Sequence, residues 1–137
     1  MAASKTTIAP LSEPWLAAVI PILERGDPAS ILWTGRAQRE MAAAGLEFKW
    51  NAYELCLQVL RTPGMLGEQI HGMIDERDNT LCETWAFLCP HPLLLKIPLY
   101  VKIALHGSQV HLVMISMHTD HSGKLLQAIR AFLKKKP

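Results

Sequence analysis

Residues 99–105 read LYVKIAL, and their pattern decides the expected fold. The apolar residues alternate with others such as Tyr100 and Lys102, which is the period of a β-strand with one face in the core. The turn residues 106–109 (HGSQ) lead into residues 110–118 (VHLVMISMH), which are apolar almost throughout. The two segments therefore predict a pair of antiparallel strands, the second of them central in its sheet.

Two more strands are expected before this pair. Residues 68–76 (EQIHGMIDE) alternate in polarity, residues 77–80 (RDNT) have the composition of a turn, and residues 81–88 (LCETWAFL) read as a return strand. A two-residue loop in this hairpin would pair His71 with Ala86. With the first pair, these segments predict a four-stranded antiparallel sheet.

In the sequence, helices are expected both before and after the strands of the sheet. Capping residues and the helical spacing of apolar side chains predict helices over residues 14–25, 36–44 and 51–61 and again after Ser122. The chain then reads as a single α+β domain, with N-terminal helices, a four-stranded antiparallel sheet and a C-terminal helix. Its expected parts are a frayed lead-in (1–13), a helical part (14–67), the antiparallel sheet (68–118) and a basic helix (122–136).

The composition of the 137 residues excludes two classes of protein. Half of the residues are hydrophobic and the formal net charge is +2, whereas a disordered chain has low hydrophobicity and high net charge. The most apolar stretch, residues 93–105, is interrupted by Lys96, Pro98 and Lys102, so no membrane-spanning helix is expected. Three cysteines without an export signal predict reduced thiols in a cytoplasmic protein.

The charge is distributed unevenly along the chain. Residues 1–88 carry 7 basic and 11 acidic side chains, a balance of −4, whereas residues 89–137 carry 7 basic and 1 acidic, a balance of +6. This asymmetry predicts a face for an acidic partner, and a basic helix is expected beside a phosphate path. The basic residues of the last helix are Lys124, Arg130, Lys134, Lys135 and Lys136. The terminal lysines also fit a role in solubility alone.

Tyr100 and Lys102 leave the same face of their expected strand. A lysine attracts phosphate and a tyrosine can stack on a base or transfer a proton, so the pair predicts an anion-binding surface. Outward Tyr and Lys side chains also occur on strands for solubility alone. His71 is expected on the outer face of the hairpin, where it could act as an acid or base near neutral pH or make a single surface hydrogen bond.

The sequence gives little support for a metal or a nucleotide cofactor. Its closest groupings of metal-ligating residues are Cys89 with His91 and His118 with His121, and neither has the spacing of a zinc motif. The G-x-S-x-G, glycine-rich phosphate-loop and H-E-x-x-H motifs do not occur. No metal and no cofactor are therefore expected.

Three short motifs follow one another in an order that resembles a known family. They are residues 45–48 (GLEF) before a helix, a hairpin over residues 68–88 with Trp85 in its return strand, and residues 100–103 (YVKI). Their order and spacing resemble the RelE-like ribonuclease toxins, and among these the motility quorum-sensing regulator (MqsR) toxins. The resemblance extends over about residues 31–118 and implies a RelE-like ribonuclease architecture.

The resemblance also implies an activity, that of a type II toxin cleaving mRNA without a metal. In that family the ribose 2′-hydroxyl attacks the adjacent phosphate, and a protein antitoxin neutralises the enzyme. The family's tyrosine falls on Tyr100, with Lys102 beside it, and its first-strand lysine falls on His71. Its glutamine falls near Trp85 and is not retained. Glu83 is the nearest polar substitute, but the simple hairpin register places it on the other face.

The leading hypothesis is therefore a cytoplasmic endoribonuclease, an mRNA interferase. Tyr100 and His71 would transfer protons, while Lys102 and Arg77 would stabilise phosphate charge. The alternative is a non-catalytic protein- or nucleic-acid-binding module of the same fold, and a metal-dependent hydrolase is a weaker third. The RNA sequence that is cut, the antitoxin and any need for the ribosome are left open.

Overall fold

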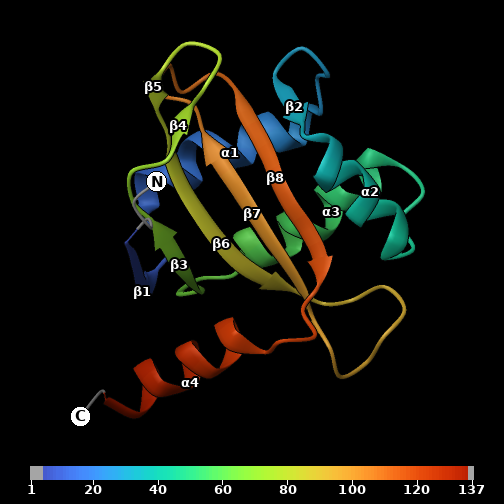
Figure 1. The fold of residues 1–137 in the computed structure, drawn as a ribbon, viewed down its shortest axis with the longest axis vertical. Helices are drawn as coiled ribbons and strands as arrows, with labels where there is room; N and C mark the ends of the chain where they lie inside the picture. The colour runs from blue at the N-terminus through green and yellow to red at the C-terminus, as the bar shows by residue number, and fades with distance from the viewer. Residues whose placement is uncertain (1–4, 136–137) are drawn as a thin grey trace.

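The computed structural model describes residues 5–135, which form two β-sheets and four helices. The main sheet has six strands in the order β1-β3-β6-β7-β8-β2, and β4 and β5 form a separate hairpin (Figure 1). The elements are β1 (Thr6–Pro10), α1 (Glu13–Arg25), β2 (Ile31–Trp33), α2 (Gly35–Ala43), α3 (Lys49–Leu60), β3 (Leu66–Ile70), β4 (Ile74–Asp75), β5 (Thr80–Leu81), β6 (Glu83–Cys89), β7 (Leu99–Leu105), β8 (Leu112–Thr119) and α4 (Lys124–Lys135).

The prediction of a four-stranded antiparallel sheet of RelE-like architecture, with only helices before it, is wrong. β1 forms where a frayed lead-in was expected and pairs antiparallel with β3 at the sheet edge; residues 1–4 of that segment lie outside the described residues. β2 lies inside the expected helical part and pairs parallel with β8, which makes the sheet mixed. Both strands are short, and their hydrogen-bond partners are distant in sequence, so local patterns do not reveal them.

The expected long hairpin over residues 68–88 is also interrupted. β3 ends at Ile70, and Gly72 has a φ of 81°, a left-handed conformation that breaks the strand. The chain then forms the small β4–β5 hairpin before β6 begins at Glu83. As a result Ala86 pairs with Glu68, whereas the two-residue loop would have paired it with His71.

The expected helices are confirmed, with small shifts at their ends. Ser12 caps α1 by accepting from the backbone of Trp15, and Gly26 ends the helix with a φ of 60°. Thr34 caps α2 in the same way. The strand over residues 99–105 is β7, as expected. Lys136, at the end of the expected last helix, lies outside the described residues.

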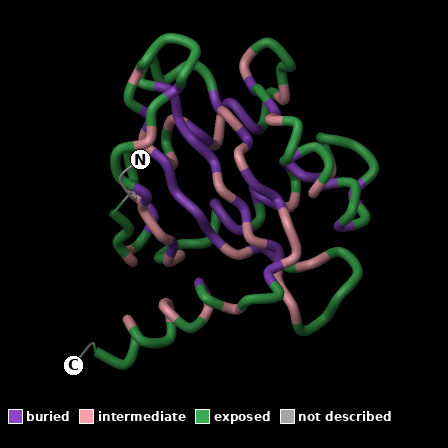
Figure 2. The backbone as a smooth tube through the Cα atoms, in the orientation of Figure 1, coloured by how far each residue is buried: buried purple, intermediate pink, exposed green. Residues whose placement is uncertain are grey.

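The hydrophobic core lies on one face of the sheet, between the strands and the helices α1 and α3 (Figure 1). Trp15 of α1 is fully buried against Trp85 of β6, and Phe87 and Val101 on neighbouring strands point the same way. The central strands are accordingly the most buried part of the tube in Figure 2.

One helix packs on the other face of the sheet, and another lies at the edge of the sheet. α4 contacts β1, β3 and β6, with Leu125 buried against Ile70 and Ala86. α2 lies along β8, beyond the end of the short β2. None of the helices in the described part of the chain is long and apolar enough to cross a membrane.

Candidate functional site

Polar side chains gather on the face of the sheet opposite the core. Lys102 of β7 is paired with Ala86 on one side and Ser116 on the other, and Tyr100 is paired with His118 of β8. Because side chains alternate along a strand, this row faces away from Trp85, Phe87 and Val101. We call this surface the polar face; its residues are Glu68, Tyr100, Lys102, Ser116 and His118.

The aromatic rings of Tyr100 and His118 stack on the polar face, near the end of β8. Their centroids are 5.0 Å apart with an interplanar angle of 22°, and Lys102 Nζ lies 5.9 Å from the centroid of the Tyr100 ring. The Tyr–Lys pair expected from the sequence therefore does share one face, and it acquires a histidine as a third member. A phenol, an imidazole and an ammonium in contact are the groups needed to move protons beside a phosphate.

Burial changes the acidity of both expected residues. It raises the pKa of Tyr100 to about 12, with smaller contributions from the nearby carboxylates of Glu68 and Asp120. It lowers the pKa of Lys102, and the positive charge of Arg36 acts in the same direction. Tyr100 therefore keeps its hydroxyl proton at neutral pH and acts as a hydrogen-bond donor.

A carboxylate from α2 reaches His118. Glu40 Oε1 accepts a hydrogen bond from the backbone N–H of Met117 at 3.0 Å, and its Oε2 accepts from Arg36 Nε at 3.1 Å. The same Oε2 lies 3.3 Å from His118 Nδ1. α2 takes this position because β2 ends after three residues and leaves the edge of β8 free, and because the Thr34 hydroxyl at the helix start lies 3.3 Å from the Ile115 carbonyl.

A β-bulge decides that His118 belongs to the polar face. The β7–β8 register shifts between Lys102, which pairs with Ser116, and Ile103, which pairs with Met114, so Ile115 is an extra residue. Without it, the period of two would send His118 to the core side together with the fully buried Met114. Sequence reasoning considered His118 only as a possible metal ligand and missed Glu40 and Arg36, whose one local signal was their i, i+4 spacing on a helix.

His71, the expected second proton-transfer residue, lies away from this site. It follows the end of β3, is exposed, and its Nε2 is 3.2 Å from the hydroxyl of Thr7. Thr7 pairs with Gln69, which pairs with Trp85 of the core face. By alternation, Thr7 and the histidine beside it therefore lie on the opposite side of the sheet from Tyr100 and Lys102.

Glu83 and Arg77 are also separate from the polar face. Glu83 accepts from the indole N–H of Trp85 two residues on, so its side chain lies on the core side at the start of β6. Arg77 lies in the turn of the β4–β5 hairpin and pairs with Asp75. Neither residue contacts Tyr100 or Lys102 in the hydrogen bonds and ion pairs of residues 5–135.

Helix α4, which carries basic residues, borders the polar face on its β1–β3–β6 side. The helix is attached through Leu125, which is buried against Ile70 and Ala86, and Ala86 is the neighbour of Lys102. Four cationic side chains of α4 are exposed: Lys124, Arg130, Lys134 and Lys135. Since no acidic residue follows Asp120 in the sequence, this helix adds a positive border to the site.

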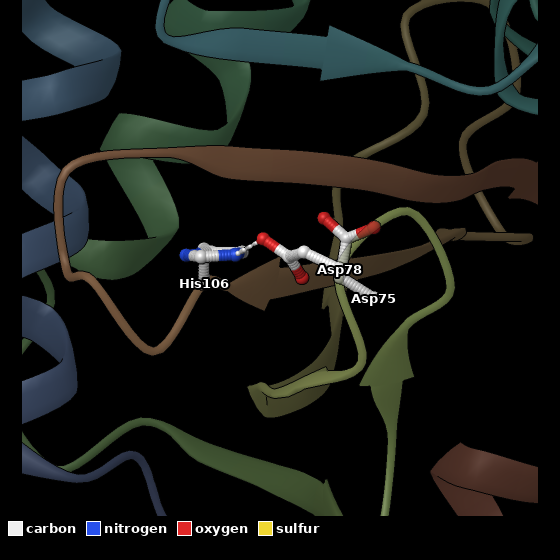
Figure 3. Close-up of side chains that lie close together, drawn as sticks. All are labelled: Asp75, Asp78 and His106. Atoms are coloured by element: carbon white, nitrogen blue, oxygen red, sulfur yellow. Dashed lines mark hydrogen bonds and ion pairs between the residues drawn. The ribbon is translucent and has the colours of Figure 1, made fainter.

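A second polar cluster joins two loops at the far end of the sheet. In residues 5–135 it is the one group of three or more metal-ligating side chains whose ligand atoms lie close together. Figure 3 shows His106, from the turn after β7, pointing to Asp78 in the turn of the β4–β5 hairpin; the Nε2–Oδ2 distance is 2.7 Å. Asp75 is held by Arg77, whose guanidinium lowers the pKa of that carboxyl to about 2. Each of the three side chains therefore has a hydrogen-bond or ion-pair partner within these two loops.

The two metal-like groupings of the sequence do not form clusters. Cys89 is buried in the core, where its thiol contacts Cys56 and its pKa is raised by that contact and by burial. His91 Nε2 is 2.8 Å from the hydroxyl of Thr119, and its Nδ1 accepts from the backbone of the loop that follows. His118 instead faces Glu40.

Comparison with protein families, with curated proteins and with solved structures finds no match for this chain. The likeness to RelE-like toxins therefore stays a prediction from short motifs. A functional assignment depends on the chemistry of the polar face itself.

Proposed function

We propose that the protein is a metal-independent endoribonuclease, an mRNA interferase of a type II toxin–antitoxin system, with its active site on the polar face. The observation that carries this proposal is the contact of Tyr100, His118 and Lys102, with ring centroids 5.0 Å apart and the lysine 5.9 Å from the phenol ring. Cleavage of RNA through its own 2′-hydroxyl needs a base, an acid and a cation, and these three side chains supply them.

The proposed reaction gives each of these side chains one role. His118 takes the proton of the ribose 2′-hydroxyl while the 2′-oxygen forms a bond to phosphorus and the bond from phosphorus to the 5′-oxygen breaks. Tyr100, whose pKa of about 12 keeps the phenol protonated at neutral pH as in an ordinary tyrosine, gives its proton to the departing 5′-oxygen. Lys102 and Arg36 stabilise the charge on the phosphate. The products are a 2′,3′-cyclic phosphate and a 5′-hydroxyl, and the proton on His118 returns to Tyr100 through solvent.

The surroundings of the face supply RNA binding. The exposed cations Lys124, Arg130, Lys134 and Lys135 on α4 would contact the phosphate backbone on one side of the site. A protein antitoxin would act in the cytoplasm by covering this surface, and the ribosome is a further candidate partner. His71 and Arg77 lie outside this arrangement and have no role in the proposed chemical step.

The test is cleavage of an mRNA in EDTA by the wild type and by Tyr100→Phe. We expect the wild type to produce cyclic phosphate ends and the variant to lose about 10²-fold or more in rate, the usual contribution of a positioned acid. Tyr53→Phe is the matched control, since Tyr53 is the other tyrosine and lies on the core side, hydrogen-bonded to Trp33. It should cleave like the wild type.

A substrate with a 2′-deoxy sugar at the cleavage site should resist the wild type, because the attacking hydroxyl is missing. Intact RNA with folded wild-type protein would refute the nuclease. In that case the alternative, a binding module, predicts that Tyr100→Ala and Lys102→Ala weaken capture of RNA or of a protein partner.

A further inference from the structure

We infer that Glu40 is a positioning residue that keeps the proton of neutral His118 on Nδ1 and thereby leaves Nε2 as the ring's proton acceptor. The catalytic meaning of this inference rests on the proposed ribonuclease function. The positioning itself is a property of α2 and β8 that is measured without RNA.

The inference begins with the donors around the Glu40 carboxylate. The backbone N–H of Met117 donates to Oε1, and Arg36 Nε–H donates to Oε2. An ionised carboxylate can only accept, so a third group beside it is stabilised when it too presents a hydrogen. His118 Nδ1, 3.3 Å from Oε2, is that third group.

The environment of the His118 ring also favours a proton on Nδ1. Nδ1 is shielded from solvent and has no aligned hydrogen bond within residues 5–135, so the Glu40 carboxylate is its charged neighbour. The side chain as a whole is 34% exposed, so solvent and substrate reach the ring from its other edge, where Nε2 lies. A proton on Nδ1 faces an acceptor, whereas a bare Nδ1 lone pair would face a negative charge.

The glutamine variant separates the two states of the ring. Glu40→Gln keeps the size of the side chain but offers one acceptor oxygen and one N–H₂ group. When the amide oxygen accepts from Met117 N–H, the N–H₂ group takes the place of Oε2, where the exposed Arg36 side chain can turn away to solvent and His118 Nδ1 must present a lone pair. The proton of neutral His118 must then move to Nε2, which can no longer accept one from the substrate.

The measurement is the nitrogen NMR spectrum of ¹⁵N-labelled protein at alkaline pH, where imidazoles are neutral, with His118→Asn used to assign the His118 ring. We expect the proton on Nδ1 in the wild type and on Nε2 in Glu40→Gln. We also expect RNA cleavage by that variant to fall about 10²-fold or more, the contribution of a general base. Glu54→Gln, which changes an exposed glutamate of α3, should alter neither.

A wild-type ring that carries its proton on Nε2 would overturn the inference, and this result does not depend on whether any variant folds. A Glu40→Gln protein that keeps both the Nδ1 proton and full cleavage would overturn it as well. If the tautomer changes as expected but the wild type does not cut RNA, the positioning by Glu40 stands and the ribonuclease proposal fails.

Discussion

Two histidine–carboxylate pairs occur within residues 5–135, and they differ in which ring nitrogens remain available. His106 engages both nitrogens: Nε2 lies 2.7 Å from Asp78 Oδ2, and Nδ1 lies 2.8 Å from the hydroxyl of Ser108. His118 has one nitrogen facing Glu40 and stacks its ring on Tyr100. The first pair is complete as it stands, whereas the second leaves a nitrogen free to react. A short His–carboxylate distance is therefore a poor guide to chemistry by itself.

The packing around the two pairs explains the difference. His106 lies in the turn after β7, which is pressed against the β4–β5 hairpin: a Cβ on Gly107 would lie 2.9 Å from the Leu81 carbonyl oxygen. The Asp78 contact thus fastens one loop to another. His118 lies near the end of β8, at the edge of the polar face, where it is half-buried and Glu40 of α2 approaches only one edge of its ring.

The largest expected difference between the pairs is in activity. His118→Asn should lower kcat/KM for RNA cleavage by about 10²–10⁴-fold, because it removes the proposed base. His106→Asn should leave it within about threefold, since its ring is fully engaged away from the polar face. Cleavage kinetics of both variants in EDTA check this. Equal losses in the two would remove the functional distinction between the pairs.

The next difference is in stability, where we expect His106 to contribute more than His118. His106→Ala should lower the free energy of unfolding by about 1 kcal/mol, because it leaves Ser108 and Asp78 without their ring contacts. His118→Asn should cost less, since His118 is more exposed and its contact with Glu40 is longer. Urea unfolding of the two variants measures both values. A larger loss for His118→Asn would mean that its ring is structural.

The smallest effect concerns how the stability of the fold changes in acid because of Asp75, which lies in the second polar cluster with Asp78 and His106. Asp75 has a folded pKa of about 2 against an ordinary 3.8, mainly because Arg77 donates hydrogen bonds to it. A lowered carboxyl pKa stabilises the fold above about pH 3.8, and this contribution is lost as the pH falls from 3.8 through 2. Asp75→Asn should therefore be less stable than the wild type at pH 5 and approach it near pH 2.

Denaturant midpoints across that pH range measure the effect. Glu76→Gln is the matched control, because it removes an exposed neighbouring carboxylate and should leave the pH dependence of the wild type unchanged. A constant gap between Asp75→Asn and the wild type at all pH values would show that the Arg77 pair does not contribute through ionisation.

The sequence predicted those elements whose signals are local. Ser12 and Thr34 as helix caps, and the alternation that brings Tyr100 and Lys102 to one face, all act within a few residues. β1 and β2 were missed because their stability comes from pairing with β3 and β8 across long stretches of chain. The expected place of His71 was wrong because Ile70 packs under α4 on the polar side of the sheet, so alternation sends the next residue to the core side.

For the site, the sequence by itself determined two residues of one strand, Tyr100 and Lys102, because a period of two is enough to put them on the same side. The tertiary structure decided the rest. An extra residue at Ile115 turns His118 to the polar face, and the short β2 leaves an edge of β8 on which Glu40 binds. Bulges and edge contacts depend on the pairing of distant segments, whose energies no local pattern contains.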